Sequence, residues 1–229
     1  MRDVTHRSLD GTRVRLRGPH ELGRPVTSVA RIADGGRLHE ISAGTRSDAR
    51  AWAEDIGVER FDQEFRVQGG RLRVGRATAG DPETRVSDPV LAAVWEGRRH
   101  AVFTHLYHGR PSDAVAFFST LRLTEHDDGM TVRPHGRATR PDPAELVKEV
   151  PELGLLEITA LNGRTRRRLP PWRGARVAGG ELFQDTVEGQ GPYFLLATRS
   201  LLVTVLPEED RVREVPGRLA TLAVETVRT

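Results

Sequence analysis

The segment from Gly163 to Arg176, GRTRRRLPPWRGAR, is the part of this sequence whose residue types point most directly to a chemical role. It contains six arginines and no aspartate or glutamate, and the nearest carboxylates in the sequence are Glu157 and Glu181. Guanidinium groups bind phosphate or carboxylate oxygens through paired hydrogen bonds, and an indole stacks on a planar group or packs beneath an arginine. The residues that we expect to contact an anionic partner are Arg164, Arg166, Arg167, Arg168, Trp172, Arg173 and Arg176.

Three kinds of partner fit this segment: a nucleic acid, a phospholipid headgroup or an acidic protein surface. The alternative is a solvated loop in a chain that is rich in arginine throughout, with Trp172 anchoring that loop to the core. Readers of single-stranded nucleic acid use exposed aromatic side chains as stacking platforms, and Phe, Trp and Tyr together number twelve in this chain. No helix-turn-helix, zinc-finger or RNP-type motif is present either, so nucleic acid is the minority hypothesis.

Histidines form the second group of interest, because His100, His105 and His108 fall within nine residues and imidazole ligates transition metals. We predict a strand over these residues, and alternation along a strand places His105 on the face opposite His100. No His-Glu-x-x-His spacing occurs. We therefore expect a core or rim histidine at position 105, with no metal and no cofactor.

Covalent catalysis has little support in the sequence. The chain has no cysteine, which excludes disulfides, thiolate nucleophiles and Cys-ligated zinc or iron–sulfur sites. No Gly-x-Ser-x-Gly elbow, Walker loop or Gly-x-Gly-x-x-Gly fingerprint occurs. Acidic groups such as Asp127-Asp128 fall at predicted turns. We name no catalytic residue, and an enzyme that uses His105 or His108 as an acid–base group on an anionic substrate remains the second hypothesis.

The overall charge does not favour any polyanion. The 229-residue chain has 35 basic and 32 acidic residues, a net charge of +3. Its sequence pI of 10.1 is high because every basic residue but Lys148 is an arginine, which hardly deprotonates. At neutral pH the molecule is almost balanced, so electrostatic steering by the whole molecule is modest.

Glycine dipeptides punctuate the chain at the spacing of β-hairpins. Residues 64–68 and 71–74 alternate apolar and polar side chains on both sides of Gly69-Gly70, which predicts a half-buried antiparallel hairpin. Further strands are predicted at 90–95, 100–107, 193–198, 200–206 and 219–227, with a hairpin at 122–133. Helices are predicted from Ser47 to Ile56, from Ser112 to Leu121 and from Asp142 to Val150, the last from a cap, proline and glutamate signature.

These elements predict an α+β protein of mainly antiparallel β-sheet with a few short helices, arranged in two lobes. Residues 134–143 have no periodicity and divide an N-terminal α+β lobe, residues 1–140, from a β-rich C-terminal lobe, residues 141–229, with one short leading helix. The apolar runs 193–197 and 201–206 are too short to cross a bilayer, and the N-terminus has no apolar signal region. We expect no membrane insertion and a cytoplasmic location.

The function that this sequence favours is non-enzymatic: a binding, adaptor or assembly module. Its protein partner would contact strand edges and the arginine segment, and self-association into an oligomer is compatible with unpaired edges. The alternatives are an enzyme that acts on an anionic substrate, and a nucleic-acid accessory factor that uses residues 164–176.

Overall fold

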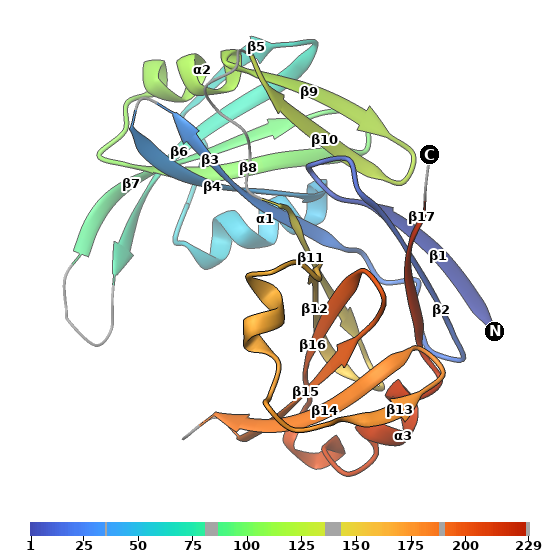
Figure 1. Ribbon diagram of the computed structural model, residues 1–229. Helices are drawn as coiled ribbons and strands as arrows, with labels where there is room; N and C mark the ends of the chain where they lie inside the picture. The colour runs from blue at the N-terminus through green and yellow to red at the C-terminus, as the bar shows by residue number, and fades with distance from the viewer. Residues whose placement is uncertain (35, 81–86, 136–142, 188–190, 228–229) are drawn as a thin grey trace. The chain divides into compact units, whose positions relative to one another are not determined.

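The computed structural model describes residues 1–34, 36–80, 87–135, 143–187 and 191–227. Contacts within this part of the chain group it into two compact units. The first contains residues 1–8, 12–26 and 145–229, and the second contains residues 9–11 and 27–144. Each unit is described by itself. The predicted α+β class with mainly antiparallel sheet is confirmed, because every strand pairing described within the two units is antiparallel (Figure 1).

The second unit is built on six strands that pair in the order β3-β4-β8-β7-β6-β5. Their bounds are β3 Thr27–Asp34, β4 Arg37–Thr45, β5 Gln63–Val67, β6 Gly70–Gly80, β7 Ser87–Glu96 and β8 His100–Tyr107. A hairpin of β9, Leu121–His126, and β10, Gly129–Pro134, completes its strands. Its helices are α1, Arg46–Asp55, and α2, Pro111–Ser119.

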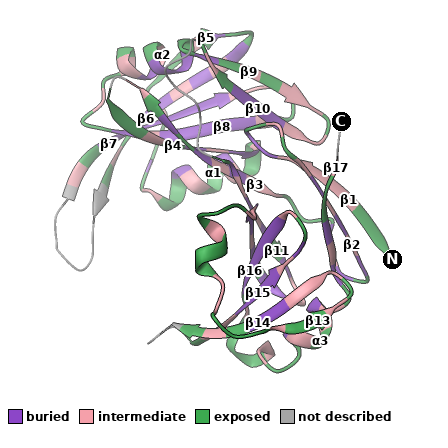
Figure 2. Cartoon of the chain, in the orientation of Figure 1, coloured by how far each residue is buried: buried purple, intermediate pink, exposed green. Residues whose placement is uncertain are grey.

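The two helices of this unit lie on opposite faces of the six-stranded sheet (Figure 1). Alternation along β7 produces this arrangement. Ala92 and Val94 belong to the apolar clusters with α1, whereas Ala93 and Trp95 belong to the cluster that contains Phe118 of α2. Strand β7 is apolar on both faces and pairs with a strand on each side, and so does β8, the strand predicted over residues 100–107. Figure 2 shows the buried residues concentrated along the strands.

The first unit contains a six-stranded sheet in the order β13-β14-β15-β16-β12-β11 and a three-stranded sheet in the order β17-β2-β1. The larger sheet consists of β11 Glu145–Val150, β12 Gly154–Ala160, β13 Ala175–Val177, β14 Gly180–Val187, β15 Gly191–Ala197 and β16 Leu201–Leu206. The smaller consists of β1 Arg2–Arg7, β2 Arg13–Gly18 and β17 Ala223–Val227. Two 3-10 turns, η1 Thr165–Arg168 and η2 Glu209–Arg211, and helix α3, Val215–Leu219, complete the unit.

Its main core lies between these elements. One face of the larger sheet contributes Leu156, Leu196 and Val203, and the smaller sheet contributes Leu16, all fully buried. Helix α3 adds Leu219 to the same cluster. The opposite face of the larger sheet has its own apolar cluster, which the arginine segment covers in part.

Two predicted helices are confirmed with their starts displaced. Helix α1 begins after Thr45 rather than at Ser47, because the Thr45 hydroxyl accepts the Asp48 N–H and the Asp48 carboxylate accepts the Thr45 N–H. Helix α2 begins after Arg110, whose N–H donates to the Asp113 carboxylate at 2.9 Å, so Ser112 is not its cap. In each case the carboxylate three residues into the helix defines its start.

The helix predicted from Asp142 to Val150 is wrong. Residue 142 lies outside the described residues, and residues 145–150 form strand β11. Leu146, Lys148 and Val150 are buried while the residues between them are more exposed, which is the period of a strand. Pairing with β12 over five residues outweighs the local capping signature. The C-terminal part of the chain thus begins with a strand where the sequence predicted a short helix.

No helix in the described part of the chain is both long enough and apolar enough to cross a membrane.

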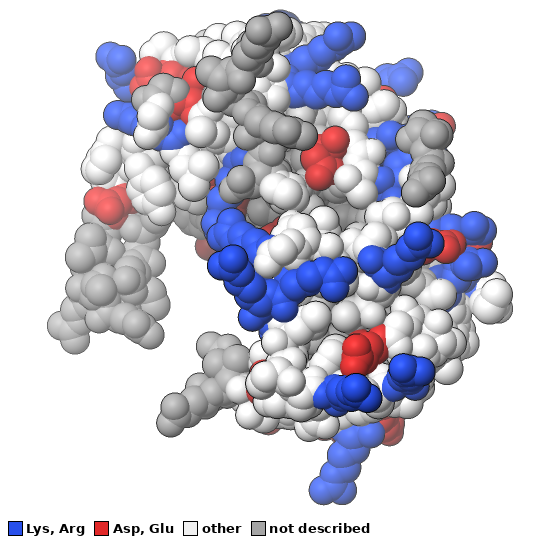
Figure 3. All heavy atoms as spheres, in the orientation of Figure 1, with Lys and Arg blue, Asp and Glu red and all other residues white. Residues whose placement is uncertain are grey.

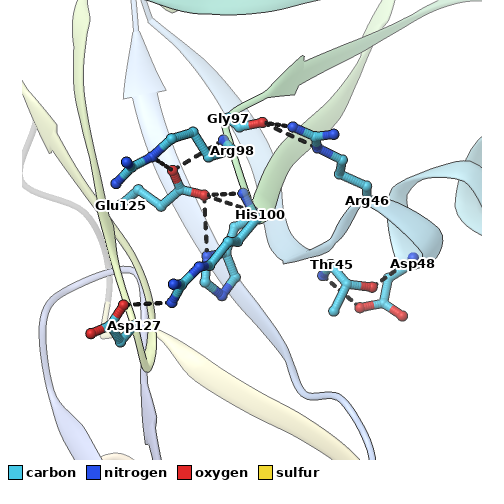
Figure 4. A network of polar contacts seen from close by, with 9 residues as sticks. Thr45, Arg46, Asp48, Gly97, Arg98, His100, Glu125 and Asp127 are labelled. Atoms are coloured by element: carbon cyan, nitrogen blue, oxygen red, sulfur yellow. Dashed lines mark hydrogen bonds and ion pairs between the residues drawn. The ribbon is translucent and has the colours of Figure 1, made fainter.

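Glu125 is the centre of a polar network in the second unit (Figure 4). Its carboxylate accepts hydrogen bonds from the backbone N–H groups of Arg98, Arg99 and His100, at 3.1, 2.6 and 2.8 Å. Burial raises the pKa of this carboxyl, but the three N–H groups and the nearby imidazole lower it further, so the net pKa lies below its usual value. Glu125 thereby fixes the turn between β7 and β8.

Lys148, the single lysine of the chain, is buried in the first unit with 1% of its surface exposed. Its ammonium donates to the backbone carbonyl of Arg24. Burial lowers the pKa of Lys148 from 10.5 to about 8, and the charge of Glu21 opposes this only in part. The folded state therefore holds a charged amine at neutral pH at a cost in stability.

We expect Lys148→Met to raise the free energy of unfolding at pH 7 by about 2 kcal/mol, since a pKa lowered this far costs about 3 kcal/mol and one hydrogen bond is lost in return. The folded-state pKa lies below that of the unfolded chain. Wild-type stability therefore rises between pH 8 and 10.5 by about 3 kcal/mol, so the advantage of the variant disappears within that interval. Urea denaturation at several pH values measures this difference. Leu156→Met, at the paired position on β12, is the control without a pH-dependent difference.

We expect Glu125→Gln to lower the free energy of unfolding at pH 7 by about 2 kcal/mol, because three charge-assisted hydrogen bonds are weakened or lost. The lowered pKa of Glu125 gives stability that is present above its unfolded value of 4.5 and is lost as pH falls through the folded value. The difference from wild type should disappear in acid. Asp127→Asn, on the same hairpin and 96% exposed, should change stability little; equal effects of the two variants would contradict the role of Glu125.

Candidate functional site

The arginine segment, residues 163–176, connects β12 to the edge strand β13 in the first unit. Hydrogen bonds order its first turn. The side-chain oxygen of Asn162 accepts the N–H groups of Arg164 and Thr165 at 2.9 and 3.1 Å. The Thr165 hydroxyl donates to the carbonyl of Ala160 at 2.7 Å. The segment therefore leaves the sheet in a defined direction and continues as the 3-10 turn η1.

Two leucines fix the segment to the outer face of the larger sheet. Leu161 and Leu169 pack, half-buried, against a cluster of the buried side chains Phe183, Leu195 and Leu202. Trp172 does not have the anchoring role that the solvated-loop alternative gave it, because 52% of its surface is exposed. Leucine packing before the two prolines holds the segment and leaves the indole at the surface.

All six arginines of the segment are exposed. Arg168 forms an ion pair with Glu157 on the neighbouring strand at 3.3 Å. Within the described residues no ion pair is found for the other five, Arg164, Arg166, Arg167, Arg173 and Arg176. Glu181, opposite Arg176 in the β13–β14 pairing, instead accepts the backbone N–H of Gly174 at 2.8 Å.

Basic side chains are also common elsewhere on the surface, but there many of them have acidic side chains nearby. On the face that Figure 3 shows, acidic side chains lie among the basic ones. Many arginines outside the segment form ion pairs, such as Arg71 with Glu96 at 2.6 Å and Arg99 with Asp127 at 2.6 Å. Arginines without an ion pair among the described residues also occur outside the segment, for example Arg50 and Arg76, so the segment is set apart by having five such arginines within thirteen residues.

A pocket of 310 Å³ lies at the end of the segment, next to β13. Trp172, Arg173 and Ala175 are part of its lining. The lining also includes Leu182, Phe183 and Gln184 of β14, Phe194 of β15 and Pro216 of α3. Arg173 is the one ionisable residue in the lining, and most of the other side chains there are apolar. The sequence did not predict this pocket, because its lining residues come from distant parts of the chain.

The predicted site residues therefore divide into two groups along the segment. Arg164, Arg166, Arg167 and Arg168 lie at or beside the 3-10 turn, and Trp172, Arg173 and Arg176 lie at or before the edge strand. The pocket brings Trp172 and Arg173 together. The segment as a whole offers exposed positive charge, an exposed indole, an apolar pocket and a strand edge.

A second pocket, of 470 Å³, lies in the second unit between the end of β5 and helix α2. Arg66, Arg122 and His135 are its ionisable lining residues. Gln68, also in its lining, donates to the carbonyl of Phe118 in the last turn of α2 and to that of Leu121, the first residue of β9. The basic residues thus lie near a helix C-terminus, where positive charge stabilises the helix dipole. This structural role explains them without a ligand.

The three histidines that the sequence singled out each have their own neighbour. His100 lies 3.4 Å from the Glu125 carboxylate, and His108 lies 3.8 Å from that of Asp88. The ring of His105 contacts Tyr107 edge-on, with 5.0 Å between centroids. Across the described ranges no group of three or more His, Asp and Glu side chains lies close enough together to hold a metal ion.

Comparison with known proteins gives no family to which these features can be referred. No family model matches the chain, and no curated protein or solved structure is significantly similar to it. The function has to be argued from the chemistry of the arginine segment and its surroundings.

We expect Leu169→Ala to free the arginine segment from the sheet, because the variant loses most of the apolar area that Leu169 buries. Trypsin should then cut after Arg168 and Arg173 about tenfold faster, with a loss of about 1 kcal/mol in the free energy of unfolding. Mass spectrometry of the first fragments measures the cleavage sites and rates. Leu155→Ala, at an exposed position on β12, should leave the cleavage rate unchanged. Equal rates in all three proteins would show that Leu169 does not hold the segment.

Proposed function

We propose that this chain is a non-enzymatic binding or adaptor module, whose arginine segment contacts an acidic surface of a partner protein. The observation that carries the proposal is the set of five exposed guanidinium groups without an ion-pair partner in the described residues, on a segment that is fixed to the sheet. An exposed ion pair contributes little to stability. Unneutralised charges held together instead favour an external anion with several carboxylates.

A protein partner fits the segment better than a nucleic acid. Trp172 is the one aromatic residue between 163 and 176, so a stacking platform for successive bases is not present there. The segment also ends in an edge strand, which a polypeptide can pair with and a nucleic acid cannot. Association of two copies through strand edges other than that of β13, and a cytoplasmic location, belong to the same proposal.

An enzyme that acts on an anionic substrate is the second candidate. The pocket beside Trp172 would bind an anionic group through Arg173, but the other residues in its lining have no ionisable side chain. Acid–base chemistry there needs a group that the lining does not supply. The pocket favours recognition of an apolar group over a reaction.

We expect the double substitution Arg166→Glu and Arg167→Glu to weaken binding of a fluorescently labelled poly-glutamate chain by about tenfold or more, because two attractive charges become repulsive. Fluorescence anisotropy over a range of salt concentrations measures the affinity. The salt dependence should also become less steep, as fewer counterions are released.

The matched control is Arg50→Glu with Arg76→Glu, which makes the same change in net charge at exposed arginines of the second unit. This control should reduce binding only slightly. If both double variants lose affinity equally, general charge and not the arginine segment determines binding, and the proposal is wrong. A single-stranded oligonucleotide of similar charge that binds far more tightly than poly-glutamate would favour the nucleic-acid alternative.

A further inference from the structure

We infer that strand β13 takes up an extended acidic peptide of the partner as an additional strand, with one apolar side chain of that peptide in the pocket beside Trp172. This inference rests on the proposed function and specifies how the partner is recognised. Three observations lead to it: an edge strand, a side-chain-sized pocket that opens next to it, and positive charge around both.

Strand β13 ends the order of strands in the larger sheet of the first unit and pairs with β14 alone among the described strands of that unit. An edge strand has backbone N–H and C=O groups that no neighbour satisfies. Its residues Ala175 and Arg176 are exposed. Main-chain hydrogen bonds to an incoming strand would satisfy these groups, which is the usual mode of strand addition.

The pocket is placed to select one side chain of such a strand. Ala175 of β13 is part of its lining, so a peptide that pairs with β13 passes the pocket mouth. Leu182 and Phe194, which form its inner wall, are 8% and 1% exposed. A volume of 310 Å³ is at the lower end of the range for small-molecule sites, roughly 300–1,000 Å³, and suits one apolar side chain.

The exposure of Trp172 at the pocket margin favours binding of a partner there. Large aromatic side chains that are half exposed at a pocket margin lose most of their contact with water when a partner binds. Tryptophan and arginine are also enriched among the interface residues that contribute most of the binding energy. The indole has no anchoring role in the folded chain, since Leu161 and Leu169 hold the segment. Its exposure of 52% is therefore available for binding.

The positive charge beside β13 favours binding of an acidic peptide over pairing with a second copy of this chain. Two copies of β13 paired edge to edge would bring Arg173 and Arg176 of one copy close to those of the other. Like charges on paired strands are destabilising. An acidic strand reverses the sign of each of these contacts.

The experiment uses the full chain and short synthetic peptides in which glutamate and threonine alternate. One peptide has leucine at its central position, a second has serine there, and a third is the leucine peptide with alternate backbone nitrogens methylated. We expect the leucine peptide to bind about tenfold more tightly than the serine peptide, and the methylated peptide to lose this advantage. Trp172 emission should shift to shorter wavelength as the peptide binds, and the amides of residues 175–177 should exchange more slowly.

Trp172→Ala should remove the preference for leucine over serine while it leaves binding of the serine peptide almost unchanged. Circular dichroism checks that this variant folds, which its exposed position favours. Trp52→Phe, in helix α1 of the second unit, is the matched control and should retain both the preference and the spectral shift.

The outcomes separate the two proposals. If all three peptides bind equally and Arg166→Glu with Arg167→Glu weakens all of them, strand addition is wrong and the acidic-partner proposal stands. If the peptides and poly-glutamate all fail to bind, both proposals are wrong. If an oligonucleotide of equal charge binds more tightly than the leucine peptide and loses affinity with Trp172→Ala, the segment recognises nucleic acid and strand addition is overturned.

Discussion

The packing of Leu161 and Leu169 on the outer face of the larger sheet is the contact on which the candidate site depends. Six arginines within fourteen residues repel one another, and a free segment would separate them. Repulsion between two exposed charges at 4 Å in water is about 1 kcal/mol, whereas full burial of a leucine side chain is worth about 1.5–3 kcal/mol. The half-buried leucines are thus sufficient to hold the segment near the sheet. Apolar packing keeps the charge concentrated, and the concentrated charge is what a partner would recognise.

Charged side chains in the interior and charged side chains of the arginine segment have different surroundings. Glu125 is mostly buried, and backbone N–H groups surround its carboxylate. Lys148 is buried with one carbonyl acceptor, and its pKa falls accordingly. In both examples a charge removed from water is either well compensated or lowers stability. The five unpaired arginines avoid that desolvation cost because they remain in water, and the leucine packing offsets the repulsion between them.

Local sequence pattern predicted much of the fold. It failed where pairing between strands determines the structure. The hairpin of β5 and β6 follows from strict alternation around Gly69-Gly70, because alternation and turn chemistry point to the same structure. In β11 the two signals conflict: Asp142, Pro143 and Glu145 resemble a helix start, while residues 145–150 alternate. Pairing with β12 decided in favour of the strand. The pairing of β2 with β17 connects the two ends of the chain, and no composition or periodicity specifies such a contact. The division of the chain at residue 140 stays a prediction.

The candidate site, too, could be predicted from the sequence only in part. The arginines were visible as a sequence pattern; all six are exposed and five of them have no ion pair among the described residues, while their binding of a partner stays a prediction. The pocket was not visible, because Trp172, Phe194 and Pro216 are far apart in the sequence and none of them has a pattern that marks a wall. A positively charged segment alone attracts any polyanion, with a strength that salt controls. The pocket and the edge of β13 add constraints of shape and hydrogen bonding that salt does not remove. In the proposed binding mode, specificity would come from the apolar lining and the open strand edge, and the arginines would supply attraction and orientation.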